Sequence, residues 1–257
     1  MFQYSFPIIL KENSLILKDL IIESTSQRKL SQLKEVLFDN SNLDFDCTLY
    51  KMYRGVYYEK DKDIFKDLRH DLTLITTGAI NQEFIKTYGH YHPKIKDKSY
   101  AEIYQIICGK ALFLLQDGPK KINKVIFVFS QENDIVIIPP NMGHITINIA
   151  QENLILANLV SRNFESLYEP MKKRKGGTYY VLENNPLKWI ANSEYAKIPA
   201  PQIVQPKNIF KPDSYIYNLA RKPKLVHFLA EPHQFPYKLE DIFSEKSFAE
   251  IKSDLKI

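Results

Sequence analysis

The sequence of 257 residues contains two cysteines, one tryptophan and eight glycines. Cys47 and Cys108 lie in apolar, strand-like segments without CxxC spacing, so we expect buried thiols in a reducing compartment rather than a disulfide framework. No run of about 18 apolar residues occurs, which argues against a membrane-spanning helix. The first residues also lack the basic leader and apolar core of a signal peptide. We therefore expect a cytoplasmic protein.

The chain also lacks a dominant charge of either sign. Its 35 basic and 30 acidic residues leave a formal net charge of +5, and the one dense basic run, MKKRKGG at 171–177, is short. Such a run is usually a solvated loop, so we expect neither a nucleic-acid nor a membrane partner. Hydrophobic residues make up 44% of the chain and charged residues 25%, which is typical of a folded globular protein.

The chain divides into three segments with different residue patterns. Residues 1–44 form the first, with a helix over about 26–38 that places Leu30, Leu33 and Leu37 on one face behind a serine N-cap. Residues 45–190 contain many short β-branched and aromatic runs separated by turn residues, which favours an antiparallel sandwich or barrel. Residues 191–257 form the third.

The third segment is rich in proline, because eight of the fourteen prolines fall between Pro186 and Pro236. This density interrupts helices and sheets, so we expect an extended arm packed on the barrel or on a partner. The end of the chain carries apolar residues at helical spacing from Leu239 onward, which predicts a closing helix.

Two histidines stand two residues apart in the segment TYGHYHPK. If this segment is a strand, His90 and His92 point to the same side. Glu102 opens the next apolar run, with Tyr104 on the same face, and Gly109 closes that run. Two imidazoles and a carboxylate in this order are candidates for a metal site, although a lone pair of histidines is more often structural.

A second group of residues follows in the segment IPPNMGHITIN. Here Pro139, Asn141, His144 and Asn148 are spaced as in the second motif of the cupin barrels, and His90, His92, Glu102 and Gly109 resemble the first motif of that family. Two departures are the long gap PKIKDKSY at 93–100 and Asn141 in place of glycine. Asparagine is the residue that best replaces glycine in a left-handed turn. The resemblance implies an all-β cupin (double-stranded β-helix or jelly-roll) barrel, preceded by the helix and followed by the arm.

Within the cupins, the chain resembles the archaeal-type glucose-6-phosphate isomerases. The resemblance covers roughly residues 25–190 and includes RKLSQLKEVLFDN, LTLITTG, AEIYQIICGKALFLLQD and NNPLKW. It implies the interconversion of glucose 6-phosphate and fructose 6-phosphate by a homodimer with one divalent metal ion per subunit. The implied metal ligands are His90, His92, Glu102 and His144. Such a mixed nitrogen and oxygen site suits Fe²⁺ or Mn²⁺ as first candidates, and Ni²⁺ or Zn²⁺ would also fit.

The resemblance also implies a phosphate pocket of hydroxyl and backbone N–H groups, formed by Tyr53, Thr73, Thr87, Gly89 and Tyr168. Each of these hydroxyls could equally be an ordinary strand or core residue. A further tyrosine and a histidine of the family are replaced here by Val160 and Ser166. The alternatives for phosphate contact on that side are Arg162 and the basic residues 172–175.

For the chemistry, we expect the metal to polarise the C1 and C2 oxygens of the sugar. Glu102 is the expected proton shuttle, and Tyr104 the expected proton donor or sugar contact. Two alternatives stay open, because the same ligands serve other cupins. One is a dioxygenase or decarboxylase acting on another small molecule, and the other is a non-catalytic sugar-phosphate-binding protein.

Overall fold

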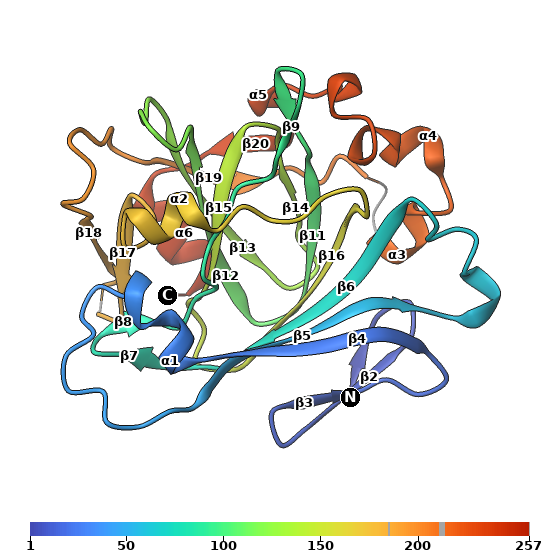
Figure 1. Cartoon of the computed structure of the whole chain (residues 1–257), viewed down its shortest axis with the longest axis horizontal. Coiled ribbons are helices and arrows are strands. Elements are labelled where there is room, and N and C mark those ends of the chain that lie inside the picture. The colour runs from blue at the N-terminus through green and yellow to red at the C-terminus, as the bar shows by residue number, and fades with distance from the viewer. Residues whose placement is uncertain (185, 211–213, 257) are drawn as a thin grey trace.

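The computed structural model describes residues 1–184, 186–210 and 214–256. Two large sheets face each other around the core (Figure 1). The first has the strand order β14 (Ile135–Ile138), β11 (Glu102–Cys108), β16 (Leu154–Ser161), β6 (Leu68–Ile75), β5 (Thr48–Tyr57) and β4 (Ile21–Lys29). The second has the order β15 (Met142–Asn148), β12 (Lys110–Asp117), β13 (Val125–Gln131), β19 (Gln202–Pro206) and β20 (Phe243–Glu245).

Smaller sheets and short helices surround the barrel. The sheets are β1 (Phe2–Gln3), β2 (Pro7–Lys11) and β3 (Ser14–Ile16); β7 (Ala79–Ile80), β8 (Glu83–Phe84), β17 (Tyr179–Leu182) and β18 (Lys188–Ala191); and the hairpin β9 (Lys94–Ile95) and β10 (Lys98–Ser99). The helices are α1 (Leu30–Leu33), α2 (Glu169–Lys173), α3 (Ile216–Leu219), α4 (Pro223–Val226), α5 (Leu239–Ile242) and α6 (Phe248–Leu255). Among the described residues, no helix has the length and apolar content needed to cross a membrane.

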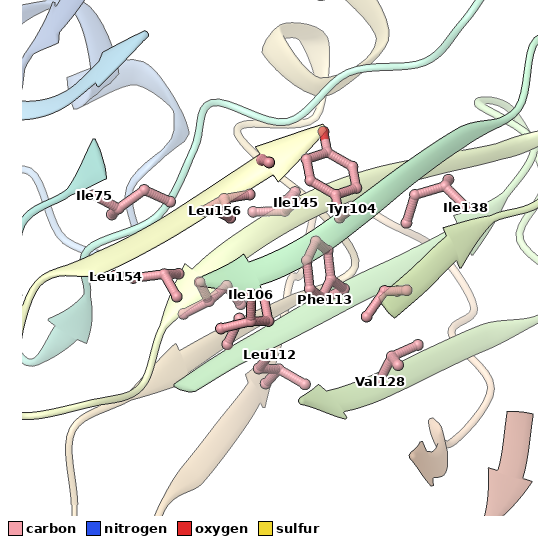
Figure 2. Packing of buried hydrophobic residues seen from close by; sticks show 14 of the residues in the cluster. Ile75, Tyr104, Ile106, Leu112, Phe113, Val128, Ile138, Ile145, Leu154 and Leu156 are labelled. Atoms are coloured by element: carbon pink, nitrogen blue, oxygen red, sulfur yellow. The ribbon is translucent and has the colours of Figure 1, made fainter. Parts of the chain in front are cut away.

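The core lies between the two large sheets. Figure 2 shows Tyr104 of β11 beside Phe113 of β12, and their ring centroids are 5.2 Å apart. All seven residues of β11 are buried, because its inner face meets the second sheet and its outer face meets the arm. Gln105, on that outer face, accepts from the backbone N of Ile216 at 3.0 Å and donates to the carbonyl of Ser214 at 3.4 Å. The predicted all-β cupin barrel is confirmed.

The helix predicted over 26–38 is wrong in its first part. Residues up to Lys29 belong to β4, which pairs antiparallel with β5. Helical backbone is limited to α1 and the 3₁₀ turn Lys34–Val36, where Leu30, Leu33 and Val36 are buried. The physical reason is that residues 24–29 carry no apolar side chain, so a helix there would have no face to bury, whereas their backbone groups pair with β5.

The closing helix is confirmed in part. Two helices, α5 and α6, are separated by strand β20, which pairs with β19. Ser247 caps α6: its Oγ accepts from the backbone N of Glu250, and the Glu250 carboxylate accepts from the backbone N of Ser247. Strands β4, β19 and β20 thus extend the sheets beyond residues 45 and 190, and the three-segment division stays a prediction. Residue 185 and residues 211–213 and 257 of the expected arm lie outside the described residues.

The two cysteines have different environments. Cys108 is buried as predicted, but Cys47 is exposed, so the prediction of a buried Cys47 is wrong. Cys47 precedes β5, where its neighbours Asp44, Phe45 and Asp46 are exposed as well. This segment is a surface connection between α1 and the barrel.

Candidate metal centre

The segment 85–92 runs beside β15 and brings the two halves of the site together. His90 N donates to the carbonyl of His144 at 3.2 Å, and His144 N donates to the carbonyl of His90 at 3.0 Å. Gly89 adopts a φ of +82°, and a Cβ there would lie 2.5 Å from Cγ1 of Ile145. Only glycine permits this close approach of the segment to β15.

Four side chains converge at one end of the barrel: His90, His92, Glu102 and His144. One ligand atom from each lies within 4.8 Å of all the others. The Nε2 atoms of His90 and His92 are 3.1 Å apart, and Oε2 of Glu102 is 3.3 Å from Nε2 of both His92 and His144. The predicted ligands are therefore brought together as a compact mixed nitrogen and oxygen cluster.

Burial and mutual contacts shift the pKa values of three of these residues, His90, Glu102 and His144. Burial, with the neighbouring His144 and His92, lowers the pKa of His90 well below its ordinary value, and burial also lowers the pKa of His144. Burial alone would raise the pKa of Glu102, but contacts with His144 and His92 hold it well below its ordinary value. Neutral imidazoles and an ionised carboxylate are the states that bind a metal ion.

The cluster fits a cation rather than a hydrogen-bonded network. Oε2 of Glu102 and Nδ1 of His144 are buried without a hydrogen-bond partner in the described part of the chain. Oε2 lies 3.3 Å from Nε2 of both His92 and His144, where a divalent ion held by these atoms would balance the charge of the carboxylate. This orphaned oxygen is the observation that makes the four residues suitable for a divalent ion.

The hairpin at 93–100, formed by β9 and β10, orients one ligand. Nδ1 of His92 donates to the carbonyl of Tyr100 at 2.9 Å, because a carbonyl oxygen can only accept. Nε2 is thereby the free nitrogen that points into the cluster. The hairpin is fixed to the second motif, since the backbone N of Asn141 donates to Oγ of Ser99 at 2.7 Å. Asn141 adopts a φ of +67°, which confirms the left-handed turn expected there.

A cavity of about 560 Å³ opens onto the cluster. Phe164 covers one side, with its ring centroid 4.5 Å from that of His92 and 4.6 Å from that of Tyr100. Tyr168 covers another side, 5.5 Å from the ring of His90. The walls carry polar and charged groups, including Glu23, Arg54, Arg69, Thr73, Thr87, Tyr88, Asn158, Arg162, Glu165 and Ser166.

A row of polar side chains crosses the first sheet on the cavity side. Tyr104 of β11 lies opposite Asn158 of β16, and Asn158 lies opposite Asp71 of β6. Asn158 Nδ2 donates to Oε1 of Glu102 at 2.8 Å and lies 3.5 Å from Oδ2 of Asp71. Arg54 of β5 then donates to Oδ2 of Asp71 at 2.7 Å. Hydrogen bonds thus link the arginine to the metal-site carboxylate.

Tyr104 lies beside the cluster, as the alternation along β11 predicts. Its hydroxyl oxygen is 3.2 Å from Nε2 of His144. Burial, with the nearby charge of Glu102, raises the pKa of Tyr104 well above its ordinary value. The phenol therefore keeps its proton at neutral pH and is a hydrogen-bond donor.

Four of the five residues expected to bind phosphate line the cavity: Thr73, Thr87, Gly89 and Tyr168. The Oγ1 of Thr87 accepts from the backbone N of Thr146 at 3.0 Å, so its own proton is free to be donated. These residues lie where a bound sugar would extend away from the cluster.

Tyr53 is a correction, because it does not line this cavity. It lies on the opposite face of β5, where its hydroxyl accepts from the backbone N of Leu15 at 2.7 Å. The residues of β5 that face the cavity are Tyr50, Met52 and Arg54. The alternation of side chains along a strand allows only one of these two sets to face inward.

The alternatives for phosphate contact near Val160 and Ser166 are also limited. Val160, Arg162 and Ser166 line the cavity. However, Nη1 and Nη2 of Arg162 donate to the two Glu23 carboxylate oxygens at 2.8 and 2.7 Å, and Nε donates to backbone carbonyls. Residues 172–175 do not line the cavity within the described chain. Each nitrogen of the Arg162 guanidinium therefore already donates within the protein.

The sequence interpretation missed Asn158, Asp71, Arg54 and Phe164. The sequence carried a signal for two of them: Asn158 and Asp71 are polar residues inside the strand-like runs LILANLV and HDLTLI. A polar residue buried in a strand needs a partner, which points to a polar site or network. Arg54 and Phe164 carried no comparable signal.

Several known proteins are similar to this chain in sequence or in structure. A family model described as glucose-6-phosphate isomerase matches residues 27–198. The glucose-6-phosphate isomerase of Thermococcus onnurineus is 30% identical over 174 residues, which cover 65% of this chain and 86% of that protein. That of Thermococcus litoralis is 30% identical over 172 residues, covering 64% and 85%. Among solved structures, Bacillus subtilis oxalate decarboxylase matches with a TM-score of 0.32 and 23% identity over 43% of this chain and 25% of that chain.

Proposed function

Because the chain belongs to the glucose-6-phosphate isomerase family, we propose that it interconverts glucose 6-phosphate and fructose 6-phosphate in a metal-dependent reaction. The observation that carries the metal dependence is the orphaned Oε2 of Glu102, which lies 3.3 Å from Nε2 of both His92 and His144. With His90, these residues would hold one divalent ion. Fe²⁺ and Mn²⁺ are our first candidates, and Ni²⁺ or Zn²⁺ also suit this donor set.

When bound, the ion supplies a Lewis acid for the C1 and C2 oxygens of the open-chain sugar. Aldose-to-ketose conversion removes a proton from C2 and adds one to C1, while the hydroxyl proton moves from the C2 oxygen to the C1 oxygen. We assign the carbon-to-carbon transfer to Glu102. Its Oε1 is held by Asn158, so the carboxylate has a fixed orientation toward the cavity.

The low pKa of Glu102 makes it a weak base, which leaves a hydride shift from C2 to C1 as the alternative. A substrate deuterated at C2 distinguishes the two. Exchange of the label into water supports the proton shuttle. Complete retention of deuterium at C1 would contradict it.

Tyr104 is the proposed donor to a sugar oxygen. It is fully protonated at neutral pH and lies beside His144 at the cluster. Donation from Tyr104 to the developing oxyanion would stabilise the enediolate between the two sugars.

The phosphate of the substrate is assigned to the hydroxyl and backbone donors of Thr73, Thr87, Gly89 and Tyr168. Thr73 is 7% exposed and faces the cavity from β6, and Thr87 and Gly89 face it from the segment that carries His90. Hydroxyl and backbone N–H groups are suitable phosphate ligands, and the position of Thr87 and Gly89 on the segment that carries His90 would fix the sugar relative to the metal site.

One assay tests the function. The protein is incubated with fructose 6-phosphate, and glucose 6-phosphate is detected with a coupled dehydrogenase. The assay is repeated after chelation and after addition of Mn²⁺, Fe²⁺, Ni²⁺ or Zn²⁺. We expect activity to be lost on chelation and restored by at least one ion. Absence of isomerisation with every ion would overturn the proposal.

The two alternatives predict different results. A cupin dioxygenase would consume oxygen, and a sugar-phosphate-binding protein would bind fructose 6-phosphate without converting it. Oxygen consumption and binding calorimetry, run on the same protein, separate these outcomes from isomerase activity. We further propose that the protein is cytoplasmic and forms a homodimer. Measurement of its mass in solution tests the dimer.

A further inference from the structure

Three arginines line the cavity, and they differ in how their donors are used. Arg162 donates from Nε to two backbone carbonyls and from both Nη atoms to Glu23. Its charge is matched by one carboxylate, and each of its three nitrogens already donates within the protein. Arg162 is therefore a structural residue that fixes β16 to the segment around Phe65 and Leu68.

Arg54 and Arg69 share a single carboxylate. Arg54 Nη1 donates to Oδ2 of Asp71 at 2.7 Å, and Arg69 Nε lies 2.9 and 3.0 Å from the two Asp71 oxygens. Asp71 is fully buried and also accepts from the backbone N of Gly55 at 2.9 Å. Two guanidinium groups and one carboxylate leave a net charge of +1 on this group of three residues, although Glu102 and Glu165 also line the cavity.

The other N–H groups of Arg54 and Arg69 have no strong hydrogen-bond acceptor among the described residues. Nη2 of Arg54 contacts only the thioether sulfur of Met52, at 3.1 Å, among the described residues, and thioether sulfur is a weak acceptor. The Nη atoms of Arg69 have no acceptor in the described part of the chain. The two side chains are 28% and 27% exposed, and both line the cavity. An unmatched positive charge with free N–H groups in a partly buried wall is suited to an anion.

The position of the pair favours the phosphate of the substrate. Thr73 lies two residues after Asp71 on the same face of β6, and its partner on β5 is Met52, two residues before Arg54. Adjacent same-face positions on a strand are about 7 Å apart. A phosphate bound by the Thr73 hydroxyl is therefore within reach of the long Arg54 side chain.

We propose that Arg54 and Arg69, held by Asp71, form an anion subsite that binds the phosphate group of the substrate together with Thr73. This subsite rests on the proposed function for the identity of the substrate, but not for the binding of a phosphate group. The paired N–H groups of a guanidinium match two phosphate oxygens, which an ammonium group does not. Arg54 and Arg69 are then specificity-determining residues that select phosphorylated sugars.

The first test uses the unaltered protein, freed of metal by chelation. Arginines are modified with phenylglyoxal in the presence and absence of inorganic phosphate and mapped by peptide mass spectrometry. We expect phosphate to protect Arg54 and Arg69, whereas Arg174, which lies outside this cavity, should react equally in both samples. Equal modification of Arg54 and Arg69 with and without phosphate would overturn the subsite.

The second test uses Arg54→Gln, with Arg174→Gln as a control that removes the same charge elsewhere. Loss of charge-assisted hydrogen bonds should raise KM for fructose 6-phosphate and Kd for inorganic phosphate by roughly tenfold to a hundredfold. Arg54→Lys should recover part of this loss, and the control should match the wild type. Conversion of unphosphorylated fructose should not change.

A folded Arg54→Gln protein with wild-type KM and phosphate affinity contradicts the inference. If this variant does not fold, Arg69→Gln is measured in its place, and the protection experiment still decides. Phosphate binding that depends on Arg54 in a protein without isomerase activity would retain the subsite and reject the proposed function. Isomerase activity with phosphate binding that is insensitive to both arginines would retain the proposed function and reject the subsite.

Discussion

Asn158 donates a hydrogen bond to Oε1 of Glu102 at 2.8 Å, from the strand directly beside it in the sheet. The other carboxylate oxygen, Oε2, faces the histidine nitrogens without a hydrogen-bond partner among the described residues. The two oxygens therefore differ: the amide fixes one, and the other is available to a metal ion. Asn158 is a positioning residue for Glu102.

Replacing Asn158 should weaken metal binding. We expect Asn158→Leu, which keeps the size but removes the donor, to raise the metal Kd by about 10- to 100-fold, since partners of metal ligands contribute on this scale. Calorimetric titration of metal-free protein measures it. Asn148→Leu is the control, because Asn148 is also buried but bonds only to backbone groups away from the cluster. A drop in stability with unchanged metal affinity is expected there, and the same result for Asn158→Leu would refute the positioning role.

Removing the Tyr104 hydroxyl should affect turnover rather than folding. We expect Tyr104→Phe to lower kcat by about 100-fold, the low end of the contribution of a general acid, with little change in metal affinity. Tyr53→Phe is the matched control from the outer face of β5, and its kcat should stay near that of the wild type. Steady-state kinetics with fructose 6-phosphate compare the two. Equal kcat values for both variants would remove Tyr104 from the reaction.

His70 should make the fold sensitive to mild acid. Its Nδ1 donates to the carbonyl of Val56, and its Nε2 accepts from the Tyr4 hydroxyl, both at 3.0 Å. Burial lowers its pKa from 6.5 to about 4. Between these values the unfolded chain binds a proton that the folded chain does not, so the free energy of unfolding falls as pH decreases from 6.5 to 4.

The lowered pKa of His70 corresponds to a change of about 3 kcal/mol in the free energy of unfolding. Urea unfolding at a series of pH values measures it. His70→Gln should flatten the dependence in this range, whereas His227→Gln, an exposed control, should not. An identical pH dependence in His70→Gln and the wild type would exclude His70 as its source.

Docking of the arm on the barrel should be a major source of stability. Tyr217 of α3 is 2% exposed, donates to the Asp61 carboxylate at 2.7 Å and accepts from the backbone N of Tyr58 at 3.0 Å. Tyr217→Ala should lower the free energy of unfolding by about 3–5 kcal/mol, the usual cost of truncating a buried aromatic residue. Tyr215→Ala, which removes a less buried ring, should cost less in the same denaturant titration. Equal losses in the two variants would contradict this role of Tyr217.

The sequence alone predicted the barrel and the four side chains of the candidate metal site. Alternation along a strand aims His90 and His92 to one side. The spacing from Glu102 to Gly109 and from Pro139 to His144 follows the two cupin motifs, although the gap from His92 to Glu102 is longer. The same local rules predicted the turn at Asn141, where asparagine adopts a positive φ. Each of these features depends on residues close in the chain or on spacing within one motif.

The tertiary structure decided which face of each strand is inside and which residues meet across strands. Alternation separates Tyr53 from Arg54, but both faces of β5 are covered, so burial alone does not show the inner one. The hairpin of β2 and β3 covers Tyr53, and Arg54 is left to the cavity. Similarly, residues 24–29 form a strand because their backbone groups pair with those of β5. Asn158 meets Glu102 only through the register of β16 on β11, a long-range pairing that local sequence does not encode.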